Sequence, residues 1–72
     1  MKAYKFKSEQ EKKDLLVIIK EMGYNIDGVD LSNKTGVRTT LNGCLHFLKH
    51  MDYKCIELVD DINFFINHLN KL

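Results

Sequence analysis

The chain has 72 residues, of which 44% are hydrophobic and 29% are charged, and its net charge at pH 7 is +1. That length fits one small domain, and this composition excludes intrinsic disorder, which combines low hydrophobicity with high net charge. The near-neutral charge argues against a protein that depends on long-range attraction to nucleic acid or membrane.

The N-terminal segment combines a strand pattern with a basic charge. Tyr4 and Phe6 alternate with lysines, which is the period of a half-buried strand, and lysines on its outer face suit a sheet edge. Residues 1–13 carry five lysines against two glutamates, so this zone has a charge of +3. No apolar run approaches the roughly 18 residues that span a bilayer, and no signal-peptide pattern follows the basic start. We therefore expect a cytoplasmic protein.

The strongest helix signal follows directly. Ser8 and Glu11 form a capping box, in which the serine hydroxyl accepts from the backbone N–H of Glu11 and the glutamate carboxylate reaches back. Apolar residues then recur at helical spacing as far as Met22, and Gly23 supplies the stop. The sequence predicts a helix over residues 8–22.

The middle of the chain has the pattern of strands separated by turns. Residues 36–41 are rich in β-branched side chains, and Asn42-Gly43 after them is the strongest short-range signal for a two-residue hairpin turn. Residues 44–48 would form the returning strand. A second turn at residues 49–52 would lead to a last strand over residues 53–59. The sequence therefore predicts a three-stranded antiparallel β-meander.

The C-terminal residues predict a second helix. Asp60 or Asp61 can cap it, and apolar residues from Ile62 to Leu69 form one stripe, with Phe64 off that stripe. The element order is strand, helix, meander, helix. This order predicts one small α+β domain that includes the whole chain.

Residues 31–48 also resemble a helix-turn-helix motif, which would make the domain mostly helical and the protein a DNA-binding transcriptional regulator. Gly36 would be the turn glycine of that motif. We prefer the hairpin because Gly43 inside a helix costs about 0.8–1 kcal/mol relative to alanine, and because DNA-binding domains usually carry a clear positive excess. In the helix-turn-helix alternative, the base-contacting residues would be Arg38, Thr39, Asn42 and His46.

No residue pattern indicates an enzyme. No serine has a neighbour that could act as its base, and no glycine-rich loop could cradle a phosphate. In the predicted hairpin register, Thr39 faces His46, and Cys44, His46 and Cys55 become neighbours, with His50 in the adjacent turn. The spacing lacks the C-x-x-C pair that is typical of structural zinc sites. We expect reduced thiols, no metal and no cofactor.

The same register places large apolar side chains on both faces of the sheet, whereas an antiparallel sheet usually leaves one face polar. Two short helices can cover one face, and an exposed apolar face usually marks a protein interface of roughly 800 Å² per partner. The sequence therefore predicts a non-enzymatic protein-binding module, homodimeric, that inhibits or regulates a partner protein by occupying its surface. Small domains rich in Lys, Asn and Ile are often associated with phages and mobile elements, so we expect a regulator of that type. The predicted interface residues are Val37, Leu41, Leu48, Tyr53, Val59 and Phe64.

Overall fold

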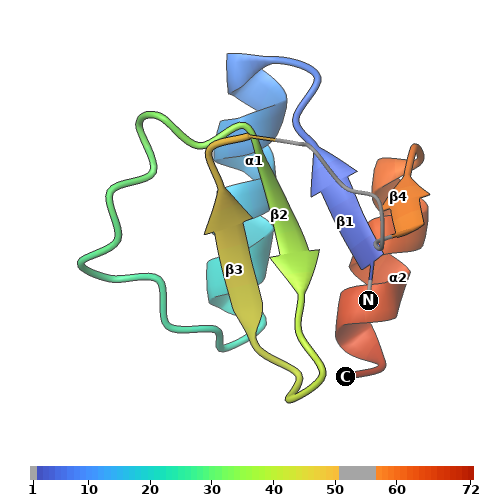
Figure 1. The fold of residues 1–72 in the computed structure, drawn as a ribbon. Coiled ribbons are helices and arrows are strands. Elements are labelled where there is room, and N and C mark those ends of the chain that lie inside the picture. Colours follow the sequence, from blue (N-terminus) through green and yellow to red (C-terminus); the bar gives the residue numbers. More distant parts are fainter. Residues whose placement is uncertain (1, 51–56) are drawn as a thin grey trace.

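The computed structural model describes residues 2–50 and 57–72. The strands form a mixed four-stranded sheet in the order β3-β2-β1-β4, in which β1 pairs antiparallel with β2 and parallel with β4 (Figure 1). The predicted α+β class and element order are confirmed. In chain order the elements are β1 (Lys2–Lys5), α1 (Glu9–Glu21), β2 (Gly36–Thr39), β3 (Leu45–Leu48), β4 (Glu57–Val59) and α2 (Ile62–Asn70).

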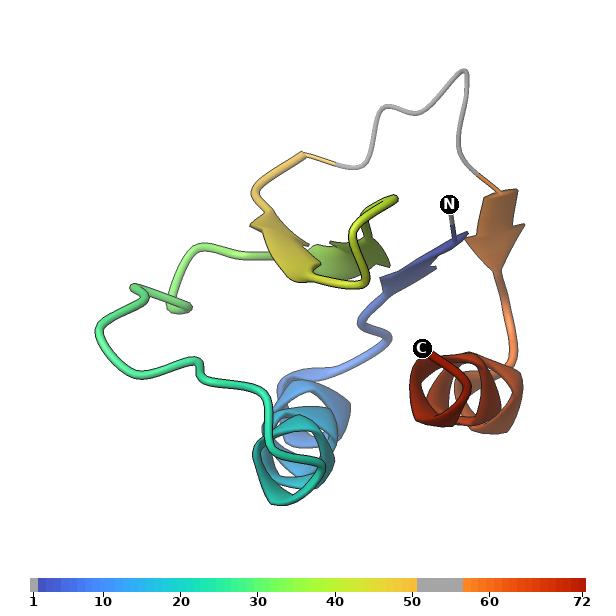
Figure 2. The same cartoon turned by 90° about the horizontal axis from the view of Figure 1, so that it is seen from below.

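Both helices pack on the same face of the sheet (Figure 2). Tyr4, Val37 and Phe47 point toward the helices from three neighbouring strands, and all three are buried. The ring of Tyr4 stacks on that of Phe65 in α2, with 5.7 Å between the ring centroids. The core is completed from the two helices and β4 by Leu15, Ile19, Val59, Phe65 and Leu69.

Both helices begin where their caps predict. The hydroxyl of Ser8 accepts from the backbone N–H of Glu11 at 3.0 Å, and the carboxylate of Asp61 accepts from the first turn of α2. The Glu11 carboxylate reaches back to the N–H of Lys7 at 2.9 Å, one residue before the expected target. It also accepts from the hydroxyl of Tyr4 at 2.6 Å, which ties the start of α1 to β1.

The first strand lies in the centre of the sheet, so the prediction of an edge strand is wrong. Ala3 and Tyr4 are fully buried, with β2 on one side and β4 on the other. Lys2 forms an ion pair with Glu57, its register partner in β4. A central position is compatible with Lys2 because the neighbouring strand supplies a carboxylate for its ammonium group.

The last strand departs from the predicted meander. Instead of pairing with β3, β4 lies parallel to β1 at the opposite edge of the sheet. The connection from β4 to α2 is only two residues long, so the two elements must be neighbours. Since Phe65 of α2 packs on Tyr4 of β1, β4 is held beside β1 as well, with Val59 opposite Tyr4. The pairing predicted for residues 53–56 lies outside the described residues.

The β2–β3 hairpin forms as predicted, but its turn is one residue longer. The N–H of Thr40 donates to the carbonyl of Cys44 at 2.9 Å, and the N–H of Gly43 donates to the carbonyl of Thr40 at 3.1 Å. Residues 41–43 therefore make a three-residue loop. Gly43 has a φ of 76°, the left-handed conformation that follows a type I turn in loops of this length.

The longer loop shifts the strand register by one residue. His46 pairs with Arg38 and not with Thr39, and Val37 pairs with Phe47. Because side chains alternate between the two faces, a shift of one residue moves every side chain of β3 to the other face relative to β2. The predicted division of side chains between the two faces is therefore wrong for this hairpin.

Residues 31–48 contain no helix, so the helix-turn-helix interpretation is wrong. Two strands and the loop between them occupy residues 36–48. The β-branched side chains of β2 favour the extended backbone, and Gly43 adopts a positive φ that a helix would not allow.

Candidate partner-binding surface

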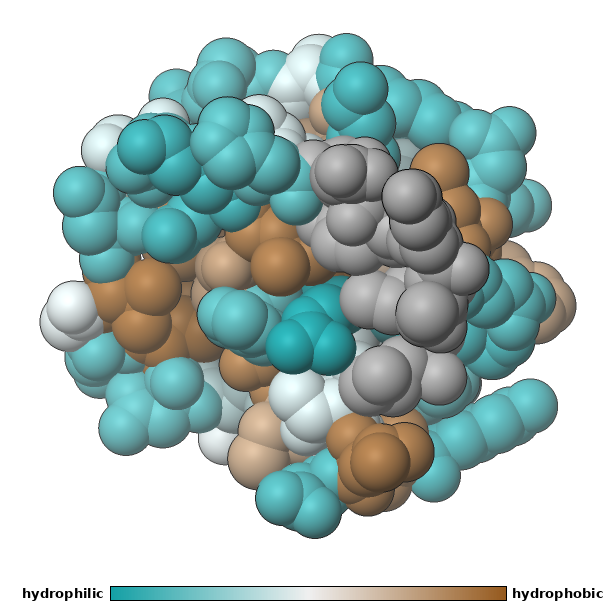
Figure 3. All heavy atoms as spheres, in the orientation of Figure 1, coloured by the Kyte–Doolittle hydropathy of each residue, from teal (hydrophilic) through white to brown (hydrophobic). Residues whose placement is uncertain are grey.

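The sheet face opposite the helices is not covered by any described helix (Figure 2). Strand alternation directs Lys5, Arg38, His46, Leu48 and Leu58 to this helix-free face. Leu58 is 56% exposed, which is unusual for a large apolar side chain on a strand. Figure 3 views this face and shows apolar areas separated by polar side chains.

Two polar side chains on the helix-free face hold each other in place. The Nε of Arg38 lies 3.3 Å from Nδ1 of His46, and one terminal guanidinium nitrogen lies 3.1 Å from the same atom. A guanidinium group has only donors, so Nδ1 of His46 is the acceptor. This pair orients two polar groups on the face without forming an acid–base pair.

Two of the predicted interface residues are buried in the core. Val37 and Val59 both face the helices, so the expectation that they are exposed is wrong. For Val37 the cause is the register shift, and for Val59 it is the position of β4 beside β1. A side chain that is buried within one chain is not available to a partner.

The other predicted interface residues do not gather in one patch. Leu48 is half-buried on the helix-free face, while Leu41 is 89% exposed at the tip of the hairpin. Phe64 is 54% exposed on α2, as its position off the apolar stripe predicts. Tyr53 lies outside the described residues.

The residues of the DNA-binding alternative are likewise separated. Arg38 and His46 lie on the helix-free face, but Thr39 is buried on the opposite one. Its hydroxyl accepts from the N–H of Lys2 at 3.2 Å and lies 3.2 Å from Nε2 of His68. Asn42 is exposed in the hairpin loop.

A hollow that the sequence interpretation did not anticipate lies between β1 and α2. It has a volume of about 310 Å³, and its walls include the ring of Phe64 and the side chains of Lys2 and His68. The ammonium group of Lys2 lies 5.5 Å from the centre of the Phe64 ring. Burial, reinforced by the positive charge of Lys2, lowers the pKa of His68. The spacing of Phe64, Asn67, His68 and Lys71 along one helix face could have revealed this hollow.

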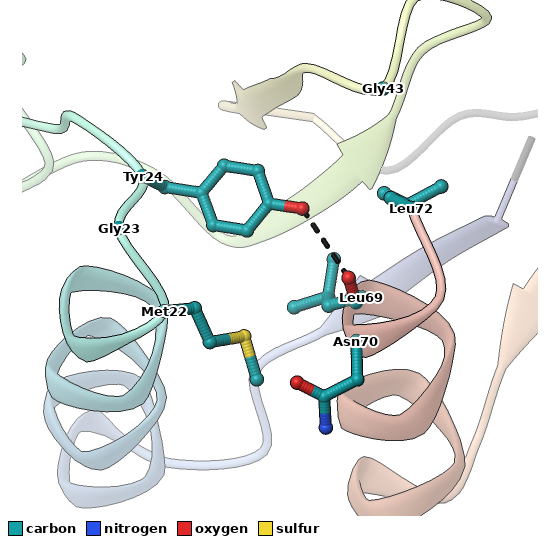
Figure 4. A pocket seen from close by; sticks show the side chains of 7 residues that line it. All are labelled: Met22, Gly23, Tyr24, Gly43, Leu69, Asn70 and Leu72. Carbon is teal, nitrogen blue, oxygen red and sulfur yellow. Dashed lines mark hydrogen bonds between the residues drawn. The ribbon is translucent and has the colours of Figure 1, made fainter.

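A second hollow, of about 370 Å³, lies where the C-terminal ends of both helices approach the hairpin loop (Figure 4). The hydroxyl of Tyr24 donates across it to the carbonyl of Leu69 at 3.4 Å. Its lining holds no pair of acid and base side chains. The lining residues are Met22, Gly23, Tyr24, Gly43, Leu69, Asn70 and Leu72.

The described residues offer no site for a metal ion. Among residues 2–50 and 57–72, no three His, Cys, Asp or Glu side chains are grouped as metal ligands. Cys44 is a free, exposed thiol, and Cys55 lies outside this part of the chain. Neither described helix has the length and apolar character needed to cross a bilayer.

No protein-family model, no curated protein and no solved structure matches the chain. Function is therefore inferred from the surface of the domain. Its most distinctive feature is the helix-free face, where Leu58 and Leu48 accompany the bonded pair of Arg38 and His46.

Proposed function

We propose that the chain is a non-enzymatic protein-binding module, which acts as a homodimer and inhibits or regulates a partner protein by covering part of its surface. The observation that carries the proposal is the position of both helices on one face of the sheet. The opposite face keeps Leu58 accessible, and exposed apolar groups of this kind are typical of interfaces.

Binding is favoured over catalysis because the hydroxyl groups of Ser8 and Thr39 and the imidazole of His46 are already held in hydrogen bonds within the fold. The hydroxyl of Ser8 caps α1, and that of Thr39 is bonded to the backbone of Lys2. The exposed imidazole of His46 is held by Arg38. The hydroxyl of Thr39 also lies 3.2 Å from Nε2 of His68, but it donates to the carbonyl of Lys2 and is 1% exposed, so it cannot act on a substrate as the activated nucleophile of acyl transfer or hydrolysis does.

A homodimer through the helix-free face fits the size of the domain. The described surface measures 4871 Å², so a standard interface of roughly 800 Å² per partner would cover about one sixth of it. Two sheets packed face to face, about 10 Å apart, would bury Leu58 and Leu48 of both copies. This burial would add the stability that a core of this size lacks.

The proposal is tested by Leu58→Asp, with Val17→Asp as the matched control. Val17 is 57% exposed on the outer side of α1, which nearly equals the 56% of Leu58. We expect wild type to sediment as a dimer, at twice the chain mass of 8.4 kDa. Leu58→Asp should weaken dimerisation at least tenfold and Val17→Asp less than twofold, with circular dichroism confirming that both variants are folded. A wild type that is monomeric at tens of micromolar, or equal effects of the two variants, would contradict the homodimer.

A further inference from the structure

A hollow rich in lysine lies at the start of α1, and of its lining only Lys5 belongs to the helix-free face. Its volume is about 200 Å³, and it opens where β1 leaves the sheet and the chain turns into the helix. Its lining includes one carboxylate, that of Glu9, and four lysines. These are Lys5, Lys7, Lys12 and Lys34.

Lys12 is the unusual member of this set because it is buried. It is 5% exposed, and among the described residues its ammonium group has no hydrogen bond and no carboxylate within 4.0 Å. In residues 2–50 and 57–72, every side-chain nitrogen or oxygen that is fully enclosed has a hydrogen-bond partner. The ammonium group must therefore keep contact with solvent, and the hollow that it lines provides that contact. The ammonium group thus meets solvent and, beyond ion-pair distance, the charge of Asp30, which leaves it able to bind an anion that enters the hollow.

The neighbouring charges leave the hollow positive. Lys7 is occupied elsewhere, since its ammonium group donates to the carbonyl of Asp60 at 2.6 Å. Within the described chain, Lys5 and Lys34 have no ion pair within 4.0 Å. The charges of Lys34 and then of Lys12 act on the carboxylate of Asp30, but this carboxylate lies beyond 4.0 Å from both ammonium groups, and its hydrogen bonds come from Ser32. The lining therefore sets three lysines against the carboxylate of Glu9, and the carboxylate of Asp30 acts on two of them from outside the lining.

The backbone at this place adds to the positive potential. The N-terminus of the 13-residue helix α1 borders the hollow through Ser8 and Glu9. The Ser8 hydroxyl accepts from the N–H of Glu11. The N–H groups of Glu9 and Gln10 have no hydrogen-bond acceptor among the described residues. Unpaired N–H groups at a helix start, together with the helix dipole, attract anions.

We propose that this hollow binds a phosphate group, with Lys12 as its buried cation and Lys5 and Lys34 at its rim. A volume of about 200 Å³ is below the range of roughly 300–1,000 Å³ that drug-sized ligands occupy, so it suits a small anion. Phosphate carries more charge and more acceptor oxygens than a carboxylate, and it can engage several ammonium groups and backbone N–H groups together. This site does not depend on the homodimer, because Lys12, Lys34 and the start of α1 lie outside the helix-free face and only Lys5 belongs to both.

The test compares Lys12→Met with Lys13→Met. Methionine preserves a flexible apolar side chain at the buried position while removing the charge, and Lys13 is an exposed neighbour on the same helix. Backbone N–H signals of Glu9, Gln10 and Thr35 are followed by NMR while inorganic phosphate replaces chloride at constant ionic strength. We expect saturable shifts in wild type, at least tenfold weaker binding in Lys12→Met, and less than a twofold change in Lys13→Met. Lys34→Met, in a loop, should weaken binding about threefold without touching the core.

The absence of saturable shifts in wild type would overturn the proposal. So would equal weakening by Lys12→Met and Lys13→Met, because the effect would then be general charge screening. A phosphoserine peptide and the same peptide without the phosphate show whether the natural ligand is a phosphate carried by a protein or free phosphate. Tighter binding of the phosphopeptide than of inorganic phosphate assigns the site to a protein-borne phosphate, and equal binding assigns it to free phosphate. Equal binding of the peptide without the phosphate would also overturn the proposal.

Discussion

The bond between Tyr4 and Glu11 joins the central strand to the start of α1, and its removal has a calculable cost. Tyr4→Phe deletes the hydroxyl that donates to the Glu11 carboxylate at 2.6 Å, while the buried ring keeps its stack on Phe65. A hydrogen bond to a charged group contributes about 1.5–3 kcal/mol. Glu11 is half-buried, and in the variant it still accepts from the N–H of Lys7. We therefore expect a loss of stability at the lower end of this range, about 1.5 kcal/mol. For a domain of this size that corresponds to a fall in Tm of roughly 6–12 °C.

A double-mutant cycle separates this bond from other effects of the substitution. Urea unfolding of wild type, Tyr4→Phe, Glu11→Gln and the double variant should give a coupling energy of about 1 kcal/mol, because the two groups touch directly. Tyr24→Phe is the matched control, since the Tyr24 hydroxyl makes a longer bond of 3.4 Å to a neutral carbonyl. A coupling energy below about 0.3 kcal/mol would refute the reasoning.

The same bond predicts a dependence on pH. Burial alone would raise the pKa of Glu11, but the hydrogen bonds from Tyr4 and from the backbone of Lys7 lower it below its usual 4.5. A lowered folded-state pKa contributes stability that is present above pH 4.5 and is lost as the pH falls through the folded value. Tyr4→Phe should therefore destabilise the protein less at pH 3 than at pH 7. An equal loss of free energy at both pH values would show that packing, not the bond, is responsible.

Three further predictions concern single residues. Burial and then the charge of Lys2 lower the pKa of His68 below 6.5, so its contribution to stability is complete above pH 6.5 and is lost as the pH falls through the folded value. Thermal unfolding between pH 7 and 5 should thus depend less on pH in His68→Gln than in wild type. Gly43→Ala should cost about 1–2 kcal/mol in urea unfolding, because alanine is strained at a φ of 76°. Ser8→Ala should cost about 1 kcal/mol through loss of the cap, and an unchanged urea midpoint would contradict that role.

The parts of the fold that the sequence predicts correctly are those set by near neighbours. The Ser8 cap, the Asp61 cap and the turn at Gly43 depend on residues within three or four positions of one another. The hairpin register depends on whether the Asn42-Gly43 pair closes a two-residue or a three-residue loop. Both loops accept glycine at a positive φ, so the residues at the turn do not distinguish between them.

The position of β4 depends on distant contacts, which local patterns do not contain. Its neighbour β1 lies more than 50 positions earlier in the chain, and the contact that decides the pairing is that between Tyr4 and Phe65. The same limit applies to the surface. The predicted strand pairing places Val37 and Val59 on the exposed face of the sheet. The observed pairing buries both side chains in the core.

For the hollow at the start of α1, by contrast, the spacing of residues within one helix already indicates the buried lysine. The buried positions of α1 are Lys12, Leu15 and Ile19, at spacings of three and four residues. Lys12 thus continues the apolar stripe by one turn toward the N-terminus, and a lysine on that stripe must either extend its ammonium group to solvent or meet an anion. Lys13 is turned 100° further around the helix and is exposed. Two adjacent lysines therefore have equal charge and unequal burial, so any difference between their methionine variants reports the buried cation itself.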